Sequence, residues 1–269
     1  MLNLLFSNQL YLGAAQAVIA ALLAIAVMLL ARWQAIHLER EVLVALLRGI
    51  VQIVAVGSVL VLLLQGPQWT SVFILAVMML AAATIAARRA RGIPGAFQVS
   101  FYGITLGSGS VIILMTWLGV IDSKISSLIP VGSMLIANSM NTNALALDRF
   151  RGEVEAHVGQ VEAGLALGAA PNNVVIPYVR AAVQASLIPR IDSLRSLGIV
   201  WIPGLMAGMV LAGSDPIYAA IYQFVVIAMI FAASGLTSLI STLFIRSRAF
   251  SEAEQLILRP RSEAAAGRG

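Results

Sequence analysis

The chain of 269 residues has no cysteine, one lysine and few charged side chains of any kind. The absence of cysteine excludes disulfides, thiolate metal sites and cysteine nucleophiles. Only 11% of the residues are charged, whereas soluble domains have roughly 25%. A soluble protein of this length could not cover its surface with so few ionic groups. Because 60% of the residues are hydrophobic as well, the composition excludes a soluble enzyme or a nucleic-acid-binding protein and indicates an integral membrane protein.

Motifs for catalysis are also missing from the sequence. The two histidines, His37 and His157, have no metal-ligand spacing with another histidine or a cysteine. A phosphate-binding loop of the kind that hydrolyses ATP needs a Gly-Lys pair, but Lys124 follows Ser123. We therefore expect no catalytic residue and no cofactor in this chain, and the sequence leaves a metal site undetermined.

Long apolar runs recur along the chain, and about 20 such residues suffice for a helix to cross a bilayer. They predict an all-α integral membrane protein with about seven spanning helices in one transmembrane domain, residues 1–245. The predicted spans are 11–31, 43–64, 69–87, 97–120, 126–147, 197–212 and 216–245. The sixth span is short and contains Pro203-Gly204. Residues 246–269 are predicted to be a disordered cytoplasmic tail.

The basic residues predict the orientation of these spans. Sixteen of the seventeen basic residues lie in alternate loops or in the C-terminal tail, and only Lys124 lies on the other side. Because cytoplasmic loops are enriched in arginine and lysine, we expect the N-terminus outside and the C-terminus in the cytoplasm. The expected location is the bacterial cytoplasmic (inner) membrane, which the chain crosses several times.

The predicted cytoplasmic loop, residues 148–196, is the only long one. Val154, Val158, Val161 and Leu165 follow one another at helical spacing and form one apolar face. Such a helix can lie on the membrane, pack against the protein's own helix ends, or bind a partner. Acidic residues opposite the apolar face argue against an anionic lipid surface.

A break follows this amphipathic helix. Gly168-Ala169-Ala170-Pro171 ends the helix, and proline suits the first turn of a new one. Two short helices that meet at a glycine predict a compact knob on the cytoplasmic side. Glu162-Ala163 followed by Gly168-Ala169 resembles the EAA loop of ABC transporter permeases, which inserts a coupling helix into a separate ATPase subunit.

Motifs from about residue 40 to 245 make the resemblance more specific. The sequence is similar to the FetB-type iron-export ABC permeases, a family that includes the plant aluminium-tolerance permeases. The matching positions include Arg48, Gln52, Gly57, Pro130, Met134, Asn138, Met140, Leu187-Ile188-Pro189, Pro203-Gly204-Leu205-Met206 and Asp215-Pro216. Two positions depart from the family pattern: Pro177 falls inside the second loop helix, and Gln184 stands where a basic residue is expected.

This resemblance implies the membrane-spanning subunit of an ABC transporter that exports iron or a related metal species. Its implied partners are membrane lipid, a second copy of the chain and a cytosolic ATPase subunit that binds ATP; no nucleic acid is implied. The residues implied to contact the ATPase are Glu162, Ala163, Gly168, Ala169 and Pro171. One alternative is an ABC permease for another solute, such as a sugar nucleotide. Another is an ion-coupled secondary transporter, which would need ionisable residues at the centres of its spans. A membrane scaffold, a further alternative, would not need a polar fifth span.

Five residues are candidates for the substrate pathway: Gln52, Met134, Asn138, Asn141 and Met206. The two asparagines are three positions apart and share a helix face. Amides inside a membrane either bind neighbouring helices or line a wet pathway. The methionines either fill gaps in the packing or act as soft metal ligands. Gln52, one turn after Arg48, is either an interhelical hydrogen-bond partner or a pathway residue.

Three further residues are candidates for a hinge or gate. Pro203 and Gly204 would either kink the sixth span, or break it or act as its hinge. Asp215, followed by Pro216, is either a helix N-cap or a carboxylate that gates the substrate.

Overall fold

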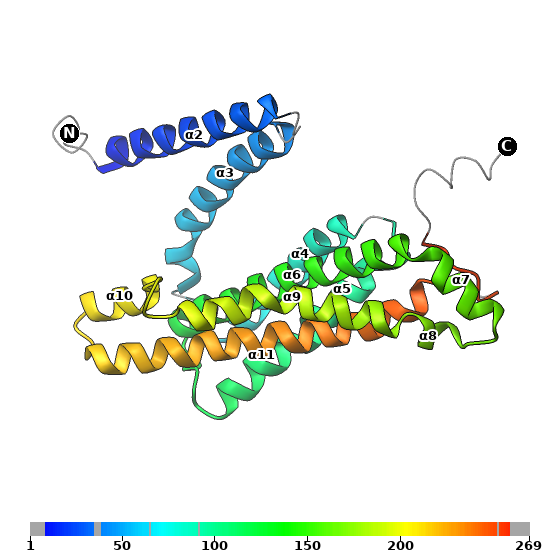
Figure 1. Ribbon diagram of the computed structural model, residues 1–269. Coiled ribbons are helices and arrows are strands. Elements are labelled where there is room, and N and C mark those ends of the chain that lie inside the picture. Colours follow the sequence, from blue (N-terminus) through cyan, green and yellow to red (C-terminus); the bar gives the residue numbers. More distant parts are fainter. Residues whose placement is uncertain (1–8, 35–38, 65, 91, 252, 259–269) are drawn as a thin grey trace. The chain divides into compact units, whose positions relative to one another are not determined.

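The computed structural model describes residues 9–34, 39–64, 66–90, 92–251 and 253–258. The regular elements within these ranges are α-helices, accompanied by two isolated β-bridges (Figure 1). The all-α prediction is therefore confirmed. Among the described residues, five helices are long and apolar enough to cross a membrane.

The chain divides into two compact units. Residues 1–66 form the N-terminal unit, and residues 67–269 form what we call the main bundle. The N-terminal unit contains α2 (Gln9–Trp33) and α3 (Glu39–Leu64). The main bundle contains α4 (Trp69–Arg89), α5 (Ala96–Trp117), α6 (Ile125–Ala156), α7 (Val158–Ala166), α8 (Pro171–Val174), α9 (Ile176–Ser196), α10 (Gly204–Leu211) and α11 (Pro216–Arg248).

The two helices of the N-terminal unit contact each other, and an ion pair of 3.6 Å between Arg32 and Glu39 links their adjacent ends. Most of their described apolar side chains are exposed within the unit, and Met28 is the buried exception. Exposed leucine, isoleucine and valine over two long helices fit a lipid environment, where a helix satisfies its own backbone hydrogen bonds.

Helices α5 and α11 of the main bundle pack closely because small residues face each other across them. Gly107 of α5 lies against Thr237 of α11, and a Cβ atom on this glycine would lie 2.6 Å from the Thr237 backbone nitrogen. Gly103, one turn earlier, lies in the same way against Ser241. Glycine opposite serine or threonine allows two backbones to approach closely, as is common between helices in membranes.

Five of the predicted spans correspond to apolar helices of the structure, namely α2, α3, α4, α5 and α11. The fifth predicted span lies within α6, which continues past residue 147 to Ala156. This helix is not among the five apolar candidates, since it contains Asn138, Asn141 and Asn143 and ends in a charged segment.

The prediction of a sixth spanning helix over 197–212 is wrong. This segment contains only α10, whose eight residues extend about 12 Å, whereas a bilayer core is about 30 Å thick. Gly198, with φ +77°, turns the chain after α9. Pro203 is the extended N-cap residue of α10, and Gly204 is its first residue. No helix runs through these two residues, so the kink interpretation is wrong and the break in the predicted span is confirmed. A hinge at Pro203-Gly204 stays a prediction.

The segment predicted to be one long loop, 148–196, contains a long helix of the main bundle. The 21-residue α9 packs against α6 and α11 (Figure 1). The hydroxyls of Ser186 on α9 and Ser238 on α11 lie 2.8 Å apart in a buried contact. Ala182 shares a core cluster with Leu147 and Phe150 of α6. Pro177 stands in the first turn of α9, where a helix tolerates proline.

The prediction of a disordered tail is wrong for residues 246–251 and 253–258. α11 continues to Arg248, and the chain then folds back so that Phe250 and Leu256 form a β-bridge. Leu258 is buried in the same cluster as these two residues. Residues 259–269 lie outside the described part of the chain.

Candidate functional site

Gly168 forms the turn of the predicted knob. Its φ is +84°, in the left-handed region that glycine adopts without strain. The Gly168 N–H donates to the Leu165 carbonyl at 2.9 Å, and the Ala169 N–H donates to the Gly164 carbonyl at 3.0 Å. This pair of bonds is the Schellman arrangement that ends a helix. Pro171 then begins α8, so the predicted break between two short helices is confirmed.

The apolar face predicted around α7 packs against the protein's own helix ends. Val154, at the end of α6, and Val161, on α7, are fully buried in one cluster with Val175. Val158 and Leu165 pack partly against the same cluster. Of the three interpretations that the sequence left open for this face, the structure supports packing within the chain.

The opposite side of the knob is exposed. Its exposed residues, which we call the knob surface, are Glu162, Ala163, Ala166, Leu167, Gly168, Ala169 and Ala170. Leu167 is 89% exposed although its side chain is large and apolar. Pro171, the remaining predicted contact residue, is half-buried. An exposed leucine at a turn fixed by hydrogen bonds, on a knob that also exposes an acidic residue, is a surface that a partner protein can bind.

The knob is also attached to the long helices. The ring of His157, at the junction of α6 and α7, stacks on the ring of Tyr178 of α9, with centroids 5.2 Å apart. The Tyr178 hydroxyl donates a hydrogen bond of 3.2 Å to the side-chain oxygen of Gln160 on α7. A displacement of α7 therefore acts directly on α6 and α9.

Asn138 connects α6 to α9. Its Nδ2 donates to the Met134 carbonyl at 2.7 Å, and its Oδ1 accepts a hydrogen bond from Nη1 of Arg190. Asn141, predicted to share this face, has an exposed side chain, so only one of the two asparagines makes the interhelical contact. The sequence pattern predicts a cytoplasmic loop at Arg190, so the contact of this residue with Asn138 was not predicted. The available signal was the length of the segment 176–196, which is sufficient for a helix that crosses a bilayer even though it contains arginines.

The other predicted pathway and gate residues lie on different helices. Gln52 lies exposed on α3 of the N-terminal unit, and Met206 lies half-buried on α10. Met134 packs partly against the main core cluster, in agreement with the packing interpretation. Asp215 caps α11, because its carboxylate accepts the Tyr218 N–H at 2.9 Å and Pro216 follows at N1. The N-cap interpretation of Asp215 is confirmed.

Buried polar side chains run through the contacts of α5, α6 and α11. Asn143 is fully buried and Gln223 is 1% exposed, and neither amide has a hydrogen-bond partner among the described residues. The same holds for the hydroxyls of Ser100, Ser139, Thr142, Ser234, Thr237 and Ser241. Buried polar groups normally bind protein, water or a ligand, so this seam is suited to holding water or polar solute atoms.

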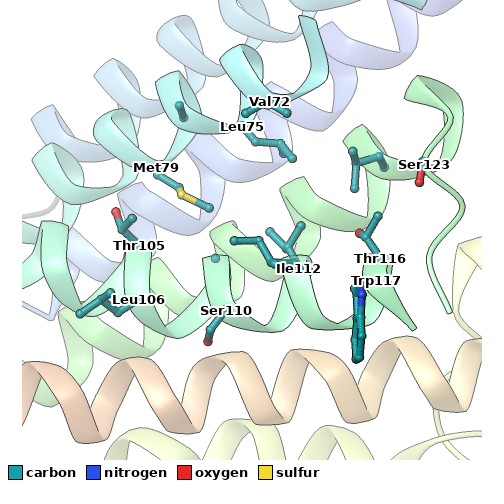
Figure 2. Close-up of a pocket in the computed structure, with 14 residues that line it drawn as sticks. Val72, Leu75, Met79, Thr105, Leu106, Ser110, Ile112, Thr116, Trp117 and Ser123 are labelled. Carbon is teal, nitrogen blue, oxygen red and sulfur yellow. The ribbon is translucent and has the colours of Figure 1, made fainter. Parts of the chain in front are cut away.

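A separate groove of about 750 Å³ lies between α4, α5 and the start of α6. Figure 2 shows Val72, Leu75 and Met79 of α4 along it, opposite residues of α5 that include Ile112. Its lining contains no charged side chain and none of the predicted pathway residues. An apolar groove of this kind suits hydrocarbon rather than a charged solute.

Comparison with known proteins places the chain among membrane proteins. It is 29% identical to the "Probable iron export permease protein FetB" of Escherichia coli, over 89% of this chain and 93% of that protein. It is 30% identical to "Protein ALUMINUM SENSITIVE 3" of Arabidopsis thaliana, over 90% and 88%. A membrane protein of Synechocystis is 32% identical over 85% and 90%. These similarities agree with the family resemblance found from the sequence motifs.

No solved structure matches the chain. The model of one protein family, described as uncharacterised, matches residues 14–250. The chain belongs to this family, UPF0014, and is similar to the bacterial and plant proteins named above.

Proposed function

We propose that this chain is the membrane-spanning permease subunit of an ABC transporter. The single observation that carries the proposal is the knob surface, which exposes Glu162 on α7 and Leu167 at a turn fixed by hydrogen bonds. The similarity to a protein named as an iron export permease supports the same function. The ATPase would be a separate cytosolic subunit that carries the ATP.

Seven crossings follow if α9 replaces residues 197–212 as the sixth span. α9 has 21 residues and extends about 32 Å, enough to cross a bilayer core. Its contacts with α6 and α11 place it beside a helix that is itself apolar enough to cross a membrane. The orientation expected from the basic residues is retained, while the cytoplasmic loop shortens to the segment around α7 and α8.

ATP would act on the permease through the knob. Closure of two ATPase subunits would displace α7, and the contacts of Tyr178 with Gln160 and His157 would pass the displacement to α9 and α6. Rigid-body movement of packed helices is a common way to switch a protein between two states. Two copies of this chain in the bacterial inner membrane would form the pathway, with iron or a related metal species as the exported solute.

An ion-coupled secondary transporter is the second candidate, and Arg190 favours it if α9 crosses the membrane. Transporters of this class use ionisable residues inside their spans as relays. An arginine cannot serve as a proton relay, however, because its guanidinium does not lose its proton in proteins. Asp192 on the same helix is a carboxylate, but it lies 3.8 Å from Arg195 and more than half of its side chain is exposed. A secondary transporter also gives no reason for the exposed knob surface.

Co-purification tests the proposal. An affinity-tagged chain should retain a nucleotide-binding subunit when extracted in mild detergent, and Glu162→Lys should release that subunit because it reverses a charge on the knob surface. Glu162→Gln, which removes the charge without reversing it, separates repulsion from simple loss of a contact. If the unsubstituted chain in vesicles without any ATPase transports solute when only an ion gradient is applied, the proposal is wrong.

A further inference from the structure

Resting on the permease function proposed above, we propose that Arg190 binds an anionic group, a carboxylate or a phosphate, on the transported solute. Asn138 holds the guanidinium between α6 and α9. A metal would then be carried as a complex with an anionic ligand, since a fixed positive charge repels a bare cation.

The contact lies far from either end of the uncharged part of α6. Residues 125–147 carry no charge, and this stretch is about 35 Å long. Asn138 stands about 20 Å along the helix axis from Lys124 and about 15 Å from Asp148. A guanidinium bonded to Asn138 is therefore at a depth where water is scarce and where a charged side chain is costly.

The other long helices of the main bundle offer Arg190 no carboxylate at this depth. The stretches 69–87 of α4, 96–117 of α5, 125–147 of α6 and 216–245 of α11 contain no charged residue. The nearest carboxylate on α9 itself, that of Asp192, lies 3.8 Å from Arg195, and both side chains are more than half exposed. Among the described residues, Arg190 forms no ion pair. Its charge is met only by the neutral amide oxygen of Asn138.

The Arg190 guanidinium also has an N–H donor available for a ligand. Its buried Nε has no hydrogen-bond partner among the described residues. The Asn138 amide is oriented by its own bond to the Met134 carbonyl, so that its oxygen faces Arg190. A guanidinium has five N–H donors in a planar fork that fits carboxylate and phosphate oxygens in a bidentate manner. An oxyanion would supply both the missing charge and the missing hydrogen-bond acceptors.

The test measures thermal unfolding of the full chain in nanodiscs of phosphatidylcholine, with citrate or inorganic phosphate as the probe and sodium chloride at equal ionic strength as the control. A ligand that binds the folded state raises Tm. We expect at least one of the two anions to raise Tm by several degrees in the original chain. Arg190→Gln should abolish this rise, Arg190→Lys should reduce it, and Arg195→Gln, a matched change on the same helix, should retain it.

A second readout separates ligand binding from a structural role. Without an anion, Arg190→Gln should leave Tm unchanged or raise it, because it removes a buried charge that has no counter-ion. A merely structural arginine would give a lower Tm in this variant. If Arg190→Gln does not fold, the Arg190→Lys variant decides alone: a reduced anion effect supports the proposal, and an unchanged one overturns it.

Three results overturn the proposal: no Tm rise from either anion, a rise that Arg190→Gln preserves, or a rise produced only by phosphatidylglycerol in the nanodisc. The last result would assign the site to a lipid phosphate rather than to a solute. The ATPase is absent from these measurements. If the chain binds the anion through Arg190 but recruits no ATPase, the permease function is refuted and the anion site is retained. If the chain recruits the ATPase but binds no anion through Arg190, only the anion site is refuted.

Discussion

At the scale of single residues, backbone geometry decides which substitutions the knob accepts. Gly168 has a φ of +84°, and a Cβ atom there would meet nothing within 4 Å. The obstacle to a side chain is therefore the backbone conformation alone, and it is largest for a β-branched residue. Gly159, on α7, also has open space around it and has no positive φ.

Gly168→Val should consequently distort the turn at a cost of about 1–2 kcal/mol and weaken binding of the ATPase subunit, while Gly159→Val should do neither. Co-purification yields and Tm values of the two variants, measured side by side, check this. Equal ATPase binding by both variants would contradict a role for the turn in coupling.

Asn138 and Asn141 offer a second comparison at this scale. Asn138→Leu removes the acceptor for Arg190 and should lower the free energy of unfolding by roughly 1–3 kcal/mol, because a buried donor loses its partner. Asn141→Leu, at an exposed position three residues later, should change it little. If Asn138→Leu assembles normally but transports less, Asn138 also lines the pathway; denaturation curves and transport assays together distinguish the two roles.

At the scale of secondary-structure elements, the approach of α5 to α11 depends on glycine. Gly107→Ala would place a Cβ atom 2.6 Å from the Thr237 backbone nitrogen, so the two helices would have to separate. We expect a loss of about 1–3 kcal/mol in stability from this overpacking. Gly109→Ala, whose Cβ atom would lie 3.6 Å from the Met79 methyl carbon, should be tolerated. Thermal unfolding in detergent checks both variants, and equal Tm values would contradict the close packing of α5 and α11.

At the scale of the whole molecule, the position of α9 determines the topology. If α9 crosses the membrane, Ile199, which is 87% exposed beyond its end, faces the outside. If residues 148–196 formed a cytoplasmic loop, residue 199 would lie near the cytoplasm. The cysteine-free chain allows single cysteines to report the side on which each position lies.

Ile199→Cys and Ser123→Cys should therefore react with an impermeant thiol reagent added outside, and Ala163→Cys should react only after the cytoplasmic side is opened. All three positions are exposed in the structure, so lack of labelling will reflect the membrane rather than burial. Labelling of Ala163→Cys from outside would contradict the coupling role of the knob. Failure of the outside reagent to label Ile199→Cys would contradict the crossing by α9.

The sequence by itself determined the features that depend on neighbouring residues. Long apolar runs fixed the class of protein and five of the helices, because a bilayer requires about 20 such residues in succession. Asp215 before Pro216 fixed the start of α11, and Gly168 fixed the end of α7, since caps and left-handed turns depend on local backbone chemistry.

Only the tertiary structure decided where α9 lies and which polar groups it meets. Its arginines and aspartate make it resemble a loop in any measure of hydropathy, and the contacts that place it in the bundle join residues 52 positions apart, Arg190 with Asn138 and Ser186 with Ser238. A local pattern cannot reveal such pairs, because a polar side chain is stabilised inside a bundle by partners that the fold brings from elsewhere in the chain.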